Sequence, residues 1–148
     1  MKICIVIAQF YPEISKKLLN GAIEKLKKNK LNNIKIVYVP GVFEIPIVIA
    51  NLIKKFDGFI ALGCVIKGQT PHFKFLCSST FYALANLSIQ TKKPIGNGIL
   101  TCNNKKQALK RSDPKKNNKG SDAAKALVSV IKIIKKWQII NCLKTLEF

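Results

Sequence analysis

The sequence has 148 residues, 48% of them hydrophobic, which is enough for one domain with a buried core and too little for two. Its longest apolar stretch, residues 45–53, is well short of the roughly 20 residues of a membrane span, and nothing near the start resembles a signal peptide. Five cysteines without short paired spacing predict neither a zinc site nor a disulfide framework. We therefore expect a soluble, cytoplasmic, single-domain protein covering residues 1–148.

The formal net charge of +19 taken alone favours a polyanion such as nucleic acid. However, Arg111 is the only arginine among the 26 basic residues, and the lysines fall mostly on the polar sides of predicted helices. Nucleic-acid binders usually exploit the planar fork of arginine together with interleaved aromatic residues. We interpret the charge as a lysine-rich solvated surface and keep a basic nucleic-acid-binding α/β domain as an alternative.

Four short runs rich in Ile and Val predict strands at residues 2–9, 34–39, 58–65 and 95–101. Helical spacing of apolar residues fills the intervals, with one helix ending near Lys30 and others at about 43–56, 73–90 and 104–110. A last helix carries a stripe that we expect to be buried, formed by Ala123, Leu127, Val130, Ile131, Ile134 and Trp137. Residues 138–148 extend past it as a C-terminal extension without an assigned role.

Strands joined by helical crossovers are parallel, with right-handed connections. The pattern therefore predicts a three-layer α/β/α sandwich around a four-stranded parallel sheet, a flavodoxin-like fold. Ligands of such sheets bind outside the carboxyl ends of the strands. The chemistry is accordingly expected in the loops that begin at Phe10, Pro40, Ile66 and Cys102.

Two of these loops hold side chains suited to catalysis or to binding a heterocycle. His72, the only histidine, follows the third strand, where an imidazole can move protons near neutral pH or, alternatively, cap the next helix. Glu44 could accept hydrogen bonds from ring N–H groups while Phe43 stacks on the ring, although a carboxylate in a first helical turn is also favoured by the helix dipole. Cys77 is disfavoured as a nucleophile because no third group orients it beside His72.

Arg111 precedes a polar segment that leads through Lys119 into the last helix, which is a plausible phosphate site or a solvated loop charge. No nucleotide fingerprint is present, because the glycines on either side of Asn97 lie inside a strand. One histidine and scattered acidic residues do not form a metal site. These observations predict neither a nucleotide-binding motif nor a metal site, and a flavin-binding module stays possible on the fold alone.

Several stretches keep a fixed order and spacing: VPGVFEIP at 39–46, LGCVIKG at 62–68, TPHF at 70–73, NGILT at 97–101, Gln107, Ala108 and Arg111, and NKG at 118–120. Together they resemble the lumazine synthase family over nearly the whole chain. The sequence departs from the commonest family pattern at Tyr11, at Lys67 and at residues 112–117. The spacing from Arg111 to Lys119 is kept.

The resemblance implies condensation of 5-amino-6-ribitylaminouracil with 3,4-dihydroxy-2-butanone 4-phosphate to 6,7-dimethyl-8-ribityllumazine, phosphate and water, the penultimate step of riboflavin biosynthesis. It implies that no metal or organic cofactor is needed, because the substrate amine itself attacks the ketone, and it makes His72 the proton-transfer residue. It implies pyrimidine contacts from Phe10, Val42, Phe43, Glu44, Val65, Ile66 and Asn97, and phosphate contacts from Gln69, Thr70, Arg111 and Lys119. A flavin- or lumazine-binding protein without catalysis is the second alternative.

The resemblance also implies pentamers or sixty-subunit shells, with Phe10, Glu44 and His72 of one subunit facing Asn97, Arg111 and Lys119 of its neighbour. We expect the pentamer, because the chain starts almost directly with its first strand and its positive charge opposes dense shell packing. Riboflavin synthase is a candidate partner. No specific nucleic acid and no membrane partner is expected.

Overall fold

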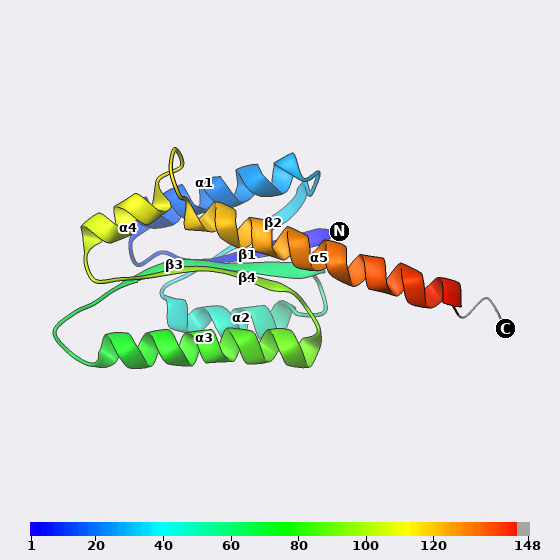
Figure 1. Ribbon diagram of the computed structural model, residues 1–148. Coiled ribbons are helices and arrows are strands. Elements are labelled where there is room, and N and C mark those ends of the chain that lie inside the picture. The colour runs from blue at the N-terminus through cyan, green and yellow to red at the C-terminus, as the bar shows by residue number, and fades with distance from the viewer. Residues whose placement is uncertain (145–148) are drawn as a thin grey trace.

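The computed structural model describes residues 1–144, with side chains described through residue 140. Its centre is a parallel four-stranded sheet in the order β2-β1-β3-β4, formed by β1 (Lys2–Ala8), β2 (Asn33–Val39), β3 (Gly58–Ile66) and β4 (Ile95–Cys102). One face is covered by α1 (Pro12–Lys28), α4 (Lys105–Ser112) and α5 (Lys119–Lys144), as Figure 1 shows. The short turn η1 (Val42–Glu44), α2 (Ile45–Leu52) and α3 (His72–Thr91) cover the other. The predicted three-layer sandwich is confirmed.

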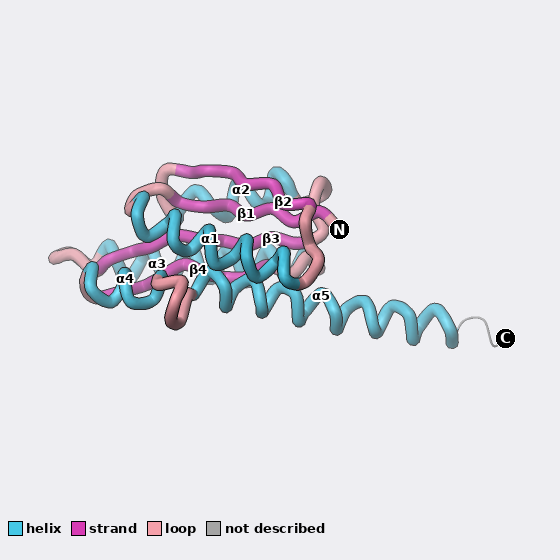
Figure 2. The backbone as a smooth tube through the Cα atoms, turned by 90° about the horizontal axis from the view of Figure 1, so that it is seen from above, coloured by secondary structure: helices cyan, strands magenta, loops and turns pink. Residues whose placement is uncertain are grey.

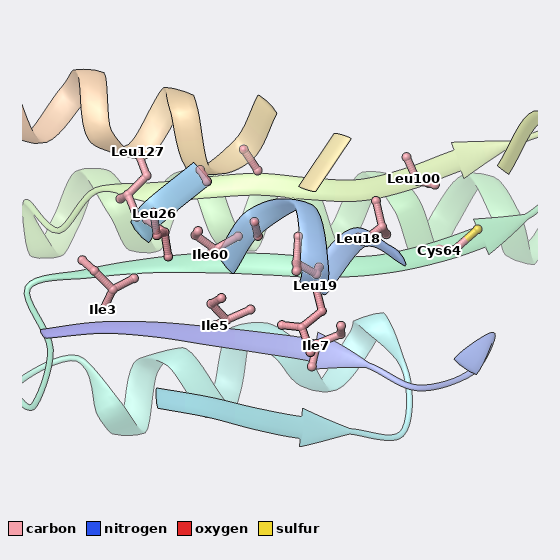
Figure 3. Packing of buried hydrophobic residues seen from close by; sticks show 14 of the residues in the cluster. Ile3, Ile5, Ile7, Leu18, Leu19, Leu26, Ile60, Cys64, Leu100 and Leu127 are labelled. Atoms are coloured by element: carbon pink, nitrogen blue, oxygen red, sulfur yellow. The ribbon is translucent and has the colours of Figure 1, made fainter. Parts of the chain in front are cut away.

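The two central strands, β1 and β3, form because their apolar side chains are buried on both faces of the sheet, whereas β2 at the edge is mostly exposed or half-buried. Along β1, Ile3, Ile5 and Ile7 point toward α1 and α5, where they join the core cluster drawn in Figure 3. The intervening Cys4 and Val6 belong to a second cluster beneath α2 and α3. Since each fully buried isoleucine contributes roughly 1.5–3 kcal/mol, these two clusters hold the helical layers onto the sheet.

Close packing of α5 depends on positions without a side chain. A Cβ atom at Gly96 of β4 would meet the carbonyl oxygen of Ala123 in α5, and one at Gly120 would meet the carbonyl oxygen of Leu18 in α1. Backbone oxygens cannot rotate out of the way as a side chain can. Glycine at these positions therefore sets how near α5 lies to both the sheet and α1.

The start of α5 is fixed by the buried amide of Asn118. Its Nδ2 donates hydrogen bonds to the carbonyl oxygens of Lys17 (2.9 Å) and Ser112 (2.6 Å), while its Oδ1 accepts one from the N–H of Ser121 (3.0 Å). The last bond caps α5, since it satisfies an N–H group of the first turn. One side chain thus joins α1, the end of α4 and the start of α5.

The predicted strands and the first four helices agree with the structure to within a few residues. The prediction for the last helix is wrong in two respects. The helix continues through Lys144, so residues 138–144 are helical, whereas 145–148 lie outside the described residues. Only part of its predicted stripe is buried. Ala123, Leu127 and Ile131 are buried, whereas Val130, Ile134 and Trp137 are exposed, Trp137 by 60%.

Length explains the exposed stripe. A helix of 26 residues spans about 39 Å, whereas the adjacent strand of 8 residues spans about 26 Å. The second half of α5 therefore runs past the sheet and has no layer beneath it, as Figures 1 and 2 show. No helix within residues 1–144 combines the length and apolar character needed to cross a bilayer.

Substituting Gly120 tests this packing. We expect Gly120→Ala to lower the free energy of unfolding by about 1–3 kcal/mol, because its Cβ would displace α5 from α1. Gly68→Ala is the matched control, since nothing lies within 4 Å of a Cβ built there, and it should change stability by less than about 1 kcal/mol. Urea unfolding at one protein concentration measures both. Equal stability of the two variants would contradict the close approach.

Candidate active site

The loops that follow β1, β2 and β3 meet at the carboxyl ends of these strands. Their approach depends on Gly63 of β3, where a Cβ atom would lie 2.7 Å from Cγ1 of Val42 and 3.1 Å from Cβ of Ala8. Because glycine leaves this space open, η1 packs directly on the sheet. The loop after β2 is thereby brought against the start of α3.

A cavity opens between these loops. Its outer part, about 490 Å³ in volume, is lined by Phe10, Pro40, Gly41, Val42, Phe43, Glu44, His72 and Leu76. Its inner part, about 190 Å³, is lined by Phe10, Tyr11, Gly41, Val42, Cys64, Val65, Ile66, His72 and Leu76. The volume suits a small heterocyclic ligand. His72 and six of the seven residues expected to contact a pyrimidine therefore gather in one place.

The two phenylalanines give the cavity aromatic walls. The side chains of Phe10 and Phe43 are 71% and 65% exposed, so their faces are open to a ligand. Planar rings stack favourably on such faces, and each contact is worth about 0.5–1.5 kcal/mol beyond the buried area. This arrangement favours a flat heterocycle.

His72 is the first residue of α3, and its imidazole is exposed at the cavity. Pro71 is the N-cap that precedes the helix, and its carbonyl oxygen accepts the N–H of Lys74 at 3.0 Å. In the described part of the chain, the imidazole forms no side-chain hydrogen bond that would cap this helix. The capping alternative for His72 is therefore not supported, and the ring is available to a ligand.

Glu44 lies in the first turn of η1, as its structural alternative expected, and it also forms a hydrogen bond that the sequence did not predict. Its Oε2 accepts the backbone N–H of Gly41 at 3.0 Å and so closes the turn between β2 and α2. The carboxylate also lines the outer cavity. The geometry therefore lets one carboxylate shape the loop and face a ligand at the same time.

The other predicted site residues do not line this cavity in the part of the chain that the structure describes. Arg111 is exposed at the end of α4, and Lys119 Nζ forms an ion pair with Asp122 Oδ2 at 2.7 Å. Asn97 lies on the edge strand β4 beside a separate hollow, and its Oδ1 accepts the N–H of Ile99. The other two, Gln69 and Thr70, are exposed in the loop before α3.

Sequence reasoning missed Tyr11, Cys64 and Leu76 as cavity residues. Leu76 could have been found, because it lies four residues after His72 and so on the same face of a helix. Tyr11 was noted only as a departure from the family pattern. Cys64 could not be separated from an ordinary core residue by its sequence position.

The thiols of the site are held neutral. Burial raises the pKa of Cys64 to about 12 and also raises the pKa of Cys77. Burial likewise raises the pKa of Cys102, and the nearby guanidinium of Arg111 partly offsets that effect. Cys4, Cys64 and Cys102 are buried, as expected for core thiols, and Cys77 has no thiolate character that would support a nucleophile.

Among the described side chains, no group of three His, Cys, Asp or Glu residues is placed to hold a metal ion. The groups that remain for chemistry are an imidazole, a carboxylate and two aromatic faces at the carboxyl end of a parallel sheet. They define an α/β protein whose cavity suits a planar heterocycle and has an imidazole at its wall that is able to move protons.

Comparison with known proteins gives the family. Residues 1–135 match the family model described as 6,7-dimethyl-8-ribityllumazine synthase. Proteins of that name from Buchnera aphidicola subsp. Acyrthosiphon pisum, strains Tuc7, 5A and APS, are each 45% identical over 139 residues, covering 90% of this chain and 87% of the relative. The chain belongs to the 6,7-dimethyl-8-ribityllumazine synthase family. The resemblance seen in the sequence is confirmed.

Two substitutions separate the structural and ligand-binding roles of Glu44. Glu44→Gln keeps an oxygen that accepts the N–H of Gly41, so we expect stability close to wild type, whereas Glu44→Ala should cost about 1 kcal/mol. Loss of the negative charge in Glu44→Gln should still weaken heterocycle binding. The control is Glu24→Ala, which removes only an exposed ion pair with Lys28 and should cost less than about 0.5 kcal/mol. Thermal unfolding measures the stability of each variant, and ligand titration measures its binding. Equal stability of the Gln and Ala variants would rule out the closing hydrogen bond.

Proposed function

We propose that this protein condenses 5-amino-6-ribitylaminouracil with 3,4-dihydroxy-2-butanone 4-phosphate to give 6,7-dimethyl-8-ribityllumazine. The observation that carries the proposal is that His72 shares one cavity with Phe10, Phe43 and Glu44, at the strand ends of a chain that belongs to this synthase family. No feature of the described site favours nucleic acid, and its proton-transfer group distinguishes it from a simple carrier of flavin or lumazine.

The reaction consists mainly of positioning and proton transfer. The amino group on the pyrimidine attacks the ketone carbonyl, and the resulting carbinolamine loses one water to form an imine. Elimination of phosphate then leaves an enol that becomes a ketone, and the ribitylamino nitrogen closes the ring on this carbonyl with loss of a second water. The nucleophiles belong to the substrate, so the protein has to hold two molecules together and shuttle protons.

In this scheme the pyrimidine lies between Phe10 and Phe43, and Glu44 accepts its N–H groups. The inner wall formed by Val65 and Ile66 excludes water from the ring edge. His72 stands at the mouth of the same cavity, where it can take a proton from the attacking amine and return it to a leaving oxygen. Each role uses a group that the fold already brings to the cavity.

Binding of the substrate phosphate requires positively charged side chains, and no lysine or arginine of the described chain lines the cavity. The cavity is built from the ends of β1, β2 and β3, whereas Asn97 and Arg111 belong to β4 and α4 at the other edge of the sheet. We propose that the Arg111 and Lys119 of a neighbouring subunit complete the site, with Gln69 and Thr70 adding donors. A head-to-tail contact of this kind closes a ring, and we propose a cytoplasmic homopentamer with riboflavin synthase as a candidate partner.

The exposed outer face of α3 supports such a contact. Phe75, Tyr82 and Ile89 are exposed along it, and Phe75 and Tyr82 line a hollow that also includes Phe43 and His72. A contiguous apolar face beside a ligand site is typical of a subunit interface. Covering it with the neighbour would exclude water from the reacting groups.

The proposed activity is tested by mixing the purified protein with both substrates and following the fluorescence of the lumazine product. We expect turnover, and we expect His72→Ala to lower it about 10- to 1000-fold without changing the size of the assembly. Tight binding of lumazine without turnover would favour the carrier. If His72→Ala is as fast as wild type in single-turnover experiments, the imidazole has no part in catalysis.

The phosphate role of Arg111 is tested by changing its shape while its charge is kept. We expect Arg111→Lys to raise the KM for the ketone phosphate on the order of tenfold, because an ammonium group cannot reproduce the bidentate fork of a guanidinium. The KM for the pyrimidine should stay close to wild type. Lys110→Gln, an exposed neighbour on α4, is the control and should change neither constant. Equal effects of Arg111→Lys on both substrates would count against a phosphate anchor.

A further inference from the structure

The free half of α5 presents an apolar stripe to solvent. This half begins near Ile131, the last buried residue among the described side chains of the helix, and projects beyond the amino ends of the strands (Figures 1 and 2). Val130, Ile133, Ile134 and Trp137 follow the spacing i, i+3, i+4, i+7, so they form one face, and all four are exposed. Because this face continues past the sheet, no other layer of the described chain covers it.

Lysines occupy the side of α5 that faces away from the stripe. Lys125, Lys132, Lys135 and Lys136 are exposed on the same helix, and its sequence from Ala123 to Lys144 contains no acidic residue. The single acidic side chain of the helix, Asp122, lies in its first turn and is paired with Lys119. The free half of α5 is therefore amphipathic and purely cationic.

A groove beside the stripe is also lined by lysines and apolar side chains. It holds about 330 Å³ between the body and α5 and is lined by Met1, Asp57, Lys92, Lys93, Pro94, Ile131, Ile134, Lys135 and Gln138. Its single carboxylate is already engaged, since Asp57 Oδ2 accepts the N–H of Lys2 at 2.7 Å. Lys92 and Lys135 are exposed at its edge, above an apolar floor that includes Ile131. Such a groove suits a ligand whose anionic head group is joined to an apolar portion.

Charge decides which occupant fits. A second copy docked through the same face of α5 would set these lysines against the same lysines of its partner. Nucleic acid would neutralise the lysines but offers nothing for Trp137 and the isoleucines. Only an anionic lipid surface supplies phosphates for the lysines and an apolar layer for the stripe, the arrangement typical of helices that lie in a membrane interface.

We propose that the free half of α5 docks the protein peripherally on anionic phospholipid bilayers. Trp137, Ile133 and Ile134 enter the boundary between head groups and acyl chains, while Lys132, Lys135 and Lys136 bind lipid phosphates. The docking surface lies at the amino ends of the strands, so the cavity of His72 at the carboxyl ends faces away from the membrane. This changes the sequence-based expectation of no membrane partner, which treated the stripe as core.

The test uses Trp137, the only tryptophan of the chain, as the reporter in the full-length protein. Vesicles of phosphatidylglycerol and phosphatidylcholine should shift its emission to the blue and sediment with the protein. Vesicles of phosphatidylcholine alone should bind at least about tenfold more weakly, because the lysines lose their partners. High salt should weaken binding to the anionic vesicles.

Two variants with matched controls assign the effect to α5. Ile133→Ser should weaken vesicle binding on the order of tenfold, whereas Ile47→Ser on α2 should not, although the two side chains are similarly exposed at 57% and 62%. Replacing Lys132, Lys135 and Lys136 by Gln should weaken binding on the order of a hundredfold in low salt. Replacing Lys105, Lys106 and Lys110 of α4 by Gln removes the same charge at the other end of the sheet and should have little effect.

Four outcomes would overturn the proposal. Equal weakening by the two lysine triples would mean diffuse attraction of a basic protein to any anionic surface. A blue shift that depends on protein concentration without vesicles would mean that a second copy covers the stripe. An equal shift with duplex DNA, or no shift with anionic vesicles, would also exclude a lipid-docking helix.

Discussion

The buried amide of Asn118 is the contact on which the rest of this structure depends. It binds backbone groups of α1, of the end of α4 and of the start of α5, so it determines how three helices meet on one face of the sheet. A Cβ atom at Gly21 would collide with this amide, and glycine there keeps the amide in place. Because the amide is buried with all its bonds formed, losing it would leave several polar groups unpaired. The segment from Arg111 to Lys119 is anchored at its base by this single side chain.

That anchoring relates the two halves of the proposed site. On one side, Gly63 admits η1 to the sheet, and the resulting cavity collects aromatic rings, a carboxylate and the imidazole of His72. On the other, Arg111 and Lys119 are presented at the surface by a loop that Asn118 holds. The separation of these groups across the sheet is the physical reason for proposing that two subunits complete one site.

The sequence predicted the sheet well because buried parallel strands leave an unmistakable pattern, as in residues 3–8 and 58–65. Most residues that the family resemblance assigns to the pyrimidine gather in one cavity because the carboxyl ends of the strands converge, and their contact with a pyrimidine stays a prediction. It failed for α5, since helical periodicity shows that an apolar face exists and not whether another layer covers it. For Glu44 the sequence offered ligand binding or a favourable helix dipole, whereas the hydrogen bond from the N–H of Gly41 could be found only from the coordinates.

The central claim is that His72 and Arg111 act in one site although they come from different subunits. The most direct measurement mixes inactive His72→Ala and Arg111→Ala chains after unfolding and lets them reassemble at random. About one interface in four then pairs an intact His72 with an intact Arg111, so activity should return to roughly a quarter of wild type while each variant alone stays near background. Recovery no greater than the sum of the two separate variants, with mixing confirmed by mass spectrometry, would place both residues in the site of one subunit and contradict the account.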